Sequence, residues 1–139
     1  MDTLRIAIAG VGTVGSGLLE LINKNKKFIQ SKIEKNIKVK AIAKRKRQEK
    51  KNIDHDTLVF NNAKDLLNFD DYDVLVELIG GDEGVAKEIT FDALRKGKNV
   101  VTANKALISK HGVKMIQIAN ANKCRLAFEA SVAGGIPII

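Results

Sequence analysis

The sequence predicts an α/β protein, a single domain in which helices cover both faces of a doubly wound parallel sheet. Short apolar runs rich in valine and isoleucine alternate along the chain with segments of helical periodicity. The first run, residues 4–9, is continuous rather than alternating, which is typical of a buried parallel strand. The chain has 139 residues, 45% hydrophobic and 29% charged, enough for one core. This composition excludes general disorder, a collagen-like repeat and a disulfide scaffold.

The first half of the chain is expected to contain three strands and two helices. After the strand at 4–9, apolar residues recur at helical spacing over 13–33. The second strand, 36–43, ends at a basic run, and a short third strand covers 58–60. Asn61 is expected to cap a short helix through Phe69, because asparagine accepts hydrogen bonds from the free N–H groups of a helix start.

The second half repeats the pattern. A strand at 73–79 is apolar except for Glu77 and is broken by two glycines. A helix at 83–96 is followed by Gly97, a usual residue just past a helix end. A strand at 99–102, a helix at 104–122 and a strand at 125–129 complete the list of expected elements. Such alternation implies a parallel sheet with right-handed crossovers.

Charge, hydropathy and cysteine content narrow the function classes. No apolar run approaches the ~18 residues that span a bilayer, and the N-terminus lacks the features of a signal peptide. A single cysteine, Cys124, fits a reducing compartment, and we expect a cytoplasmic protein. Residues 44–51 include six basic residues and one acidic residue, so most of the net charge of +8 is local. With 4% aromatic residues and no tryptophan, neither a nucleic acid nor a membrane is an expected partner.

A glycine motif follows the first strand. Gly10-Val11-Gly12-Thr13-Val14-Gly15 has the G-x-G-x-x-G spacing, and here it leads from an apolar strand into an amphipathic helix. In a Rossmann-like fold Gly10 allows the tight turn, Gly12 the approach of a pyrophosphate, and Gly15 close packing of helix on strand. The helix N-terminus supplies free N–H groups for the phosphates. The alternative is a strand-to-helix turn without a ligand.

The end of the second strand indicates which dinucleotide is preferred. An NAD site places an acidic residue there to bind the ribose 2′-hydroxyl, whereas this strand ends in Ala43-Lys44-Arg45. Arg45 offers a planar guanidinium and Lys44 or Lys46 a point charge for a 2′-phosphate. We therefore expect NADP(H) to be preferred, with NAD(H) possible. The alternative is a solvated basic loop.

Lys105 stands where a cation is unfavourable. It follows Asn104, an expected helix cap, and helix N-termini disfavour positive charge. The position also lies after the carboxyl end of a strand, where doubly wound folds bind ligands. Lys105 is therefore a candidate catalytic and cofactor-binding residue, and an exposed lysine without a role is the alternative.

Three stretches resemble the homoserine dehydrogenase family: VTANKALI at 101–108, FEASVAGGIPI at 128–138 and DVLVELIGG at 73–81. The resemblance extends over all 139 residues. It implies a Rossmann-like domain of an enzyme that reduces L-aspartate 4-semialdehyde to L-homoserine with NADPH or NADH. This reaction leads towards threonine, isoleucine and methionine.

The resemblance also implies residue roles. Cofactor contacts are implied for Gly12, Thr13, Val14, Arg45, Gly80, Gly81 and Lys105, with Arg45 near the 2′-phosphate, the Gly80-Gly81 pair on the nicotinamide side and Lys105 near the reaction centre. A sodium-like monovalent cation is implied at Glu129, Val132, Gly134 and Ile136. Oxygen donors of this kind suit a hard cation. A buried Glu129 that caps the glycine turn is the alternative.

Family members continue into a substrate and dimerisation domain that carries the acid–base lysine, and the present sequence contains none of that region. We therefore expect residues 1–139 to be the dinucleotide-binding domain, with 130–139 beginning the connection to the absent domain. The fragment is expected to be inactive, and to form a homo-oligomer only with the second domain present. Two alternatives are another NAD(P)-dependent dehydrogenase, such as an aspartate dehydrogenase, and a non-catalytic nucleotide- or nucleic-acid-binding module using residues 44–51.

Overall fold

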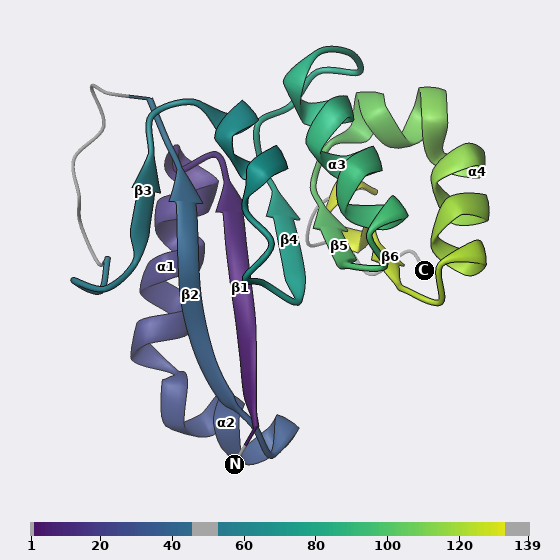
Figure 1. Cartoon of the computed structure of the whole chain (residues 1–139). Helices are drawn as coiled ribbons and strands as arrows, with labels where there is room; N and C mark the ends of the chain where they lie inside the picture. The colour runs from purple at the N-terminus through teal and green to yellow at the C-terminus, as the bar shows by residue number, and fades with distance from the viewer. Residues whose placement is uncertain (1, 46–52, 133–139) are drawn as a thin grey trace.

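The computed structural model describes residues 2–45 and 53–132, and these form a parallel sheet flanked by helices (Figure 1). The six strands are β1 Thr3–Ala9, β2 Asn36–Ala43, β3 Leu58–Phe60, β4 Val74–Glu77, β5 Asn99–Thr102 and β6 Leu126–Ala127. The helices are α1 Thr13–Lys24, α2 Lys26–Ile33, α3 Val85–Arg95 and α4 Lys105–Ala121, with the 3-10 helices η1 Ala63–Asn68 and η2 Glu129–Ser131. The predicted doubly wound fold is confirmed.

The order of the strands places a topological switch in the middle of the sheet. All pairings are parallel, in the order β3-β2-β1-β4-β5-β6. The chain therefore leaves β1 towards one edge of the sheet and returns to β4, on the other side of β1. Ligands of open α/β sheets bind in the crevice at such a switch, beyond the carboxyl ends of the strands.

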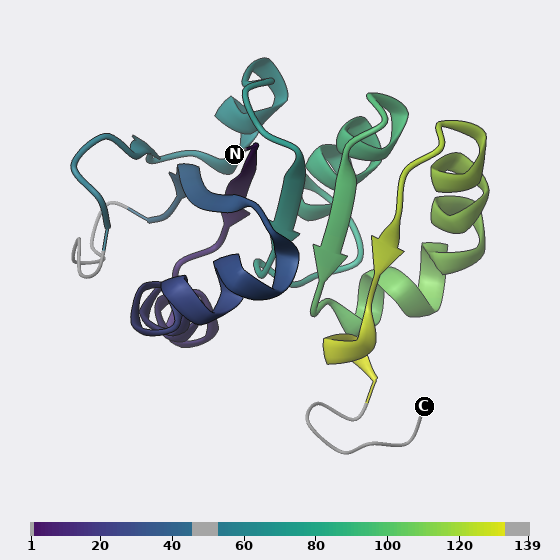
Figure 2. The same ribbon diagram turned by 90° about the horizontal axis from the view of Figure 1, so that it is seen from below.

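Helices lie on both faces of the sheet (Figure 2), and a separate hydrophobic core lies on each face. Ile6, Ile8 and Ile42 pack with Leu19 and Ile22 of α1 on one face. The other face packs against η1, α3 and α4 through small residues of β1 and β2 and larger ones elsewhere, namely Ala7, Ala9, Ala41, Leu66, Leu75, Leu94, Val100, Leu107 and Met115. The alternation of buried residues between the two faces is what a sheet covered on both sides requires. In the described part of the chain, every helix is too short or too polar to cross a membrane.

The helix predicted over 13–33 is two helices. α1 ends at Lys24 and is capped by Asn25, whose backbone and side-chain N–H groups both donate to the Leu21 carbonyl at 3.0 Å. The buried face of α1 consists of Gly15, Leu19 and Ile22, at the spacing of one helix face. Val14 and Leu21, although apolar, lie off this face and are 64% and 54% exposed.

Several other boundaries differ from the predictions by one or two residues. Asn62 rather than Asn61 caps the short helix, its Oδ1 accepting from the Lys64 N–H at 3.0 Å. β4 ends at Glu77, two residues earlier than predicted. The last strand is only Leu126–Ala127, and Glu129 opens η2 instead of ending a strand.

The pairing of β1 with β2 contains an irregularity. Ile6 pairs with Val39 but Ala7 pairs with Ala41, so Lys40 has no partner residue on β1. Such an extra residue is a β-bulge. The Lys40 ammonium instead forms an ion pair with Asp71 at 2.7 Å.

Candidate functional site

The turn after β1 is held by close contacts that only glycine permits. Gly10 has a φ of +99°, and a β-carbon there would lie 2.8 Å from the Leu78 carbonyl oxygen. A β-carbon on Gly15 would lie 2.2 Å from the Gly10 carbonyl oxygen. The turn is also tied to its neighbours, since the Gly10 N–H donates to the Ala43 carbonyl at 2.9 Å and the Leu78 N–H to the Ala9 carbonyl at 2.8 Å. This geometry matches the tight turn and close packing expected of Gly10 and Gly15.

The start of α1 presents backbone donors. Gly12 is the N-cap residue and provides no side-chain capping bond, and the Ser16 N–H donates to the Gly12 carbonyl at 2.9 Å. Thr13 and Val14 form the exposed first turn. N–H groups in a first helical turn have no partner within the helix, and together with the helix dipole they favour an anion.

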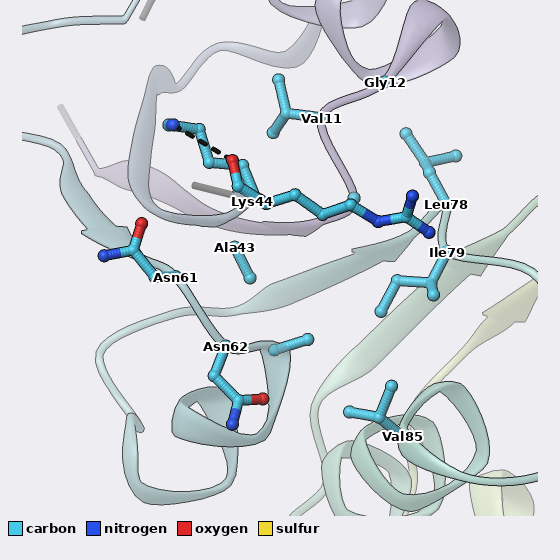
Figure 3. Close-up of a pocket in the computed structure, with 12 residues that line it drawn as sticks. Val11, Gly12, Ala43, Lys44, Asn61, Asn62, Leu78, Ile79 and Val85 are labelled. Atoms are coloured by element: carbon cyan, nitrogen blue, oxygen red, sulfur yellow. Dashed lines mark hydrogen bonds between the residues drawn. The ribbon is translucent and has the colours of Figure 1, made fainter. Parts of the chain in front are cut away.

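A cavity of about 610 Å³ opens beside this turn at the switch between β1 and β4. Its lining residues are Gly10, Val11, Gly12, Ala43, Lys44, Arg45, Asn61, Asn62, Ala63, Leu78, Ile79 and Val85. Figure 3 shows Asn61 and Asn62 on one side of it, with Leu78 and Ile79 across from them. The cavity thus brings together the first two motif glycines and both cations predicted after β2.

The two cations differ in their surroundings. Lys44 is only 7% exposed; its Nζ lies 3.4 Å from the Arg45 carbonyl, and its N–H donates to the Phe60 carbonyl at 3.0 Å (Figure 3). Arg45 is exposed at the rim of the same cavity. None of the described residues that line the cavity is acidic. Lys46 lies outside the described residues.

Gly80 and Gly81 lie in the turn after β4, away from the lining of that cavity. Both have positive φ angles, +87° and +85°. The neighbouring Glu77 is fully buried, and its Oε1 accepts from the N–H groups of Ile79 at 2.7 Å and Gly80 at 3.1 Å. Its Oε2 accepts from the Thr102 hydroxyl at 2.7 Å.

The same network continues to the start of α4. The Thr102 hydroxyl oxygen accepts from the Asn104 N–H at 3.0 Å. The Asn104 amide donates to the Gly81 carbonyl at 2.6 Å, and its oxygen caps the helix by accepting from the Leu107 N–H at 3.1 Å. Lys105 comes next and is exposed; within the described ranges its ammonium has no hydrogen bond or ion pair.

The outer part of the β4 turn is held by charges from α3 and α4, and the Lys87 ammonium of α3 lies 2.7 Å from Glu83 Oε2. The Lys110 ammonium lies 3.0 Å from an Asp82 carboxylate oxygen and 2.9 Å from one of Glu83, and His111 Nε2 lies 3.1 Å from Glu83 Oε1. Hydrogen bonds from Lys87 and then Lys110 lower the pKa of Glu83 to about 2. Salt-bridging to Lys110 also lowers the pKa of Asp82. This turn therefore has polar anchors at both ends.

Comparison with known proteins agrees with this geometry. Residues 10–129 match a family model described as the NAD-binding domain of homoserine dehydrogenase. The chain belongs to the homoserine dehydrogenase family. It is 36% identical to homoserine dehydrogenase of Bacillus subtilis, over 100% of this chain and 32% of that relative.

Solved structures give the same result. A homoserine dehydrogenase from Thiobacillus denitrificans superposes with a TM-score of 0.88 at 36% identity, covering 99% of this chain and 32% of that one. A hyperthermophilic archaeal homoserine dehydrogenase in complex with NADPH superposes with a TM-score of 0.79 at 25% identity, covering 98% and 46%. The chain spans about a third of the length of the curated relatives it matches, such as the 32% of the B. subtilis protein. It is thus the nicotinamide-dinucleotide-binding, Rossmann-like domain of this oxidoreductase family.

The cation site predicted for homoserine dehydrogenase lies only partly within the described residues. Glu129 is exposed, and its carbonyl accepts from the Val132 N–H at 3.1 Å. Gly134 and Ile136 lie outside the described residues. Among the described residues no three histidine, cysteine or acidic side chains form a metal-binding group.

Sequence reasoning missed two parts of the site. Asn61, Ile79 and Val85 line the cavity from three different segments, and no local pattern connects them. Glu77 was noted only as an exception in an apolar strand. That exception was the available signal, because an acidic residue in a buried strand needs several hydrogen-bond donors around it.

Proposed function

We propose that this domain binds NADP(H) in preference to NAD(H) and supplies the cofactor half of an enzyme that reduces L-aspartate 4-semialdehyde to L-homoserine. One observation carries the preference: β2 is followed directly by Lys44 and Arg45, which both line the cavity, and none of the described residues lining it is acidic. An NAD site needs an acidic acceptor at this position for the ribose hydroxyl. The related archaeal enzyme solved with NADPH is consistent with this choice.

In this proposal different residues bind different parts of the cofactor. Gly12 and the first turn of α1, with Thr13 and Val14, bind the pyrophosphate through backbone N–H groups. Arg45 binds the 2′-phosphate through its planar guanidinium, and the partly desolvated Lys44 adds positive charge beside it. Desolvation strengthens such an interaction, since the effective dielectric constant falls.

At the other end, the turn with Gly80 and Gly81 supports the nicotinamide. The bound cofactor supplies the hydride. Lys105 lies at the start of α4 on the same edge of the sheet, and in this proposal it contacts the cofactor and places positive charge near the carbonyl being reduced. That charge stabilises an oxygen that becomes negative as hydride arrives.

The remaining functions belong to a second domain. In this proposal residues 130–139 begin the connection to it, it supplies the acid–base lysine and the subunit contacts, and a sodium-like cation is held by Glu129, Val132, Gly134 and Ile136 near that connection. The complete enzyme is a cytoplasmic homo-oligomer on the route to threonine, isoleucine and methionine, with no nucleic acid or membrane partner. The isolated 139 residues bind the cofactor without turnover.

Calorimetric titration of the 139-residue domain with NADPH and NADH tests the cofactor choice. We expect NADPH to bind about tenfold more tightly than NADH, and Arg45→Gln to remove that difference by weakening NADPH alone, because a charge-assisted contact is lost. Arg125→Gln is the matched control, since Arg125 is exposed at the start of the β6 segment. Equal or tighter binding of NADH by the unaltered domain would overturn the proposal.

A further inference from the structure

Glu77 is a fully buried carboxylate at the end of an otherwise apolar strand. Burial of a carboxylate costs several kcal/mol unless hydrogen bonds replace the lost water. Here both oxygens are satisfied: Oε1 accepts from the N–H groups of Ile79 and Gly80, and Oε2 accepts from Thr102. A hydrophobic residue would fill the strand position without these three donors, so packing alone does not explain the choice of an acid.

The hydrogen bonds have a consistent direction. The Asn104 N–H donates to the Thr102 hydroxyl oxygen, which leaves the hydroxyl proton to donate to Glu77. The two backbone N–H groups on the other side can only donate as well. Glu77 is thus the common acceptor on which donors from the β4 turn and from β5 converge.

The two ends of this network are the elements proposed to meet the nicotinamide. On one side lie the N–H of Gly80 and, through Asn104, the carbonyl of Gly81. On the other lies the N-cap of α4, directly followed by Lys105. Glu77 and Thr102 are also paired across β4 and β5, and the Ala103 N–H donates to the Glu77 carbonyl at 3.3 Å.

Packing does not hold the turn at its centre. A β-carbon on Gly80 would have no atom within 4 Å, and one on Gly81 would first meet the Glu83 carbonyl oxygen at 3.9 Å. A turn in open space with positive φ at successive residues depends on hydrogen bonds for a single conformation. At the strand side the turn is held by hydrogen bonds to Glu77, and at its far end by the ion pairs of Asp82 and Glu83.

We propose that Glu77 is a positioning residue: with Thr102 and Asn104 it holds the Gly80-Gly81 turn and the start of α4 in one fixed relation, so that the turn and Lys105 together receive the nicotinamide half of the cofactor. This inference rests on the proposed function and deepens it. It predicts that breaking the network weakens binding of the nicotinamide half while leaving the adenosine half unaffected.

The test compares two ligands on variants of the 139-residue domain. NADPH contains both halves, and 2′-phospho-ADP-ribose lacks the nicotinamide. Thr102→Val removes the link between Glu77 and Asn104 at nearly constant volume; we expect about tenfold weaker NADPH binding and unchanged binding of 2′-phospho-ADP-ribose. Thr102→Ser keeps the hydroxyl and restores NADPH binding. Glu77→Gln gives the same selective loss, because an amide donates where Oε2 must accept, and Glu88→Gln, on the exposed surface of α3, is its control.

Amide hydrogen exchange of the ligand-free domain gives a second measurement. The Gly80 N–H is expected to exchange at least about tenfold faster in Thr102→Val and Glu77→Gln than in the unaltered domain, with no change in Glu88→Gln. Equal weakening of both ligands, or unaltered NADPH binding by Thr102→Val, would overturn the positioning role. If the unaltered domain binds neither ligand, the proposed function is wrong, and so is the proposed role of Glu77 in cofactor binding. The exchange rates then still report whether Glu77 holds the turn.

Discussion

The turns after β1 and β4 lie side by side at the switch point, and they are held in different ways. In the β1 turn, backbone atoms approach so closely that a β-carbon on Gly15 would lie 2.2 Å from the Gly10 oxygen. In the β4 turn, Gly80 has open space around it and its N–H is bound by Glu77. The β1 turn is fixed by close backbone contacts and backbone hydrogen bonds, whereas the β4 turn is fixed by hydrogen bonds to a buried side chain.

This difference teaches which changes each turn tolerates. In the β1 turn helix packs directly on strand, and the hydrogen-bond donors are backbone groups. A larger side chain in this turn should therefore distort it, whereas the loss of a polar side chain should not. The β4 turn tolerates added volume, but it depends on a polar network that joins β4, β5 and α4. Substitutions that add only a methyl group therefore separate the two cases.

The largest effect is expected for Gly15→Ala. The new methyl group would collide with the Gly10 carbonyl, which is backbone and has no other rotamer, and we expect a loss of about 3 kcal/mol of unfolding free energy together with loss of dinucleotide binding. Urea denaturation measures the first effect. Gly17→Ala is the control two residues away: it has nothing within 4 Å and lies inside α1, so a gain of about 1 kcal/mol is expected. Equal stability of Gly15→Ala and the unaltered domain would contradict steric control.

Gly80→Ala is expected to cost less, about 1 kcal/mol, from the strain of a positive φ without any collision. The same denaturation series measures it. Gly112→Ala, inside α4 with its methyl group 3.5 Å from the Ile108 side chain, provides a matched gain of about 1 kcal/mol. A cost as large as that of Gly15→Ala would show that the β4 turn is also sterically held.

Lowering the pH tests the comparison further, because ion pairs of Asp82 and Glu83 hold the β4 turn. The pKa of Glu83 falls from 4.5 to about 2 in the folded protein, so its contribution to stability is present above pH 4.5 and is lost as the pH falls towards 2. The stability difference between the unaltered domain and Glu83→Gln should therefore be largest at neutral pH and shrink over that interval. Unfolding titrations at a series of pH values measure this stability difference. A difference that does not change with pH would argue against a role of the Glu83 ion pairs in holding the turn.

The smallest effect on stability is expected for Lys105→Ala. A cation in the first turn of α4 is unfavourable, so its removal should raise the unfolding free energy by about 0.5 kcal/mol. Affinity for NADPH should fall in the same variant. Stability and binding would then change in opposite directions, as expected of a residue kept for function; a loss of stability would contradict this view.

Much of the fold could be predicted because the strands are short apolar runs bounded by polar or turn-forming residues. β2, β3 and β5 have the predicted bounds at both ends. The break at Asn25 could not be predicted, since the apolar spacing continues through it and a single side-chain bond to Leu21 marks the change.

The site was predictable where it is local in sequence. The glycine motif and Arg45 lie within short segments whose chemistry is evident from residue type. Asn61 and Val85 line the same cavity only because the strand order brings their segments together, and no local sequence pattern predicts this. The Glu77 network joins residues 25 positions apart through Thr102, and a single acid in an apolar strand was its only trace.

The bulge at Lys40 has a consequence for the choice of cofactor. Side chains along a strand alternate between the two faces, so one extra residue exchanges the faces for everything that follows it. Val39 and Ile42 consequently share a core although an odd number of positions separates them. Lys44 and Arg45 follow the bulge in the chain, so the bulge also determines the faces on which they lie. The proposed preference for NADP(H) therefore depends on the number of residues in β2 as well as on their type: deleting one residue from the middle of β2 would keep Lys44 and Arg45 but move each of them to the other face of the sheet.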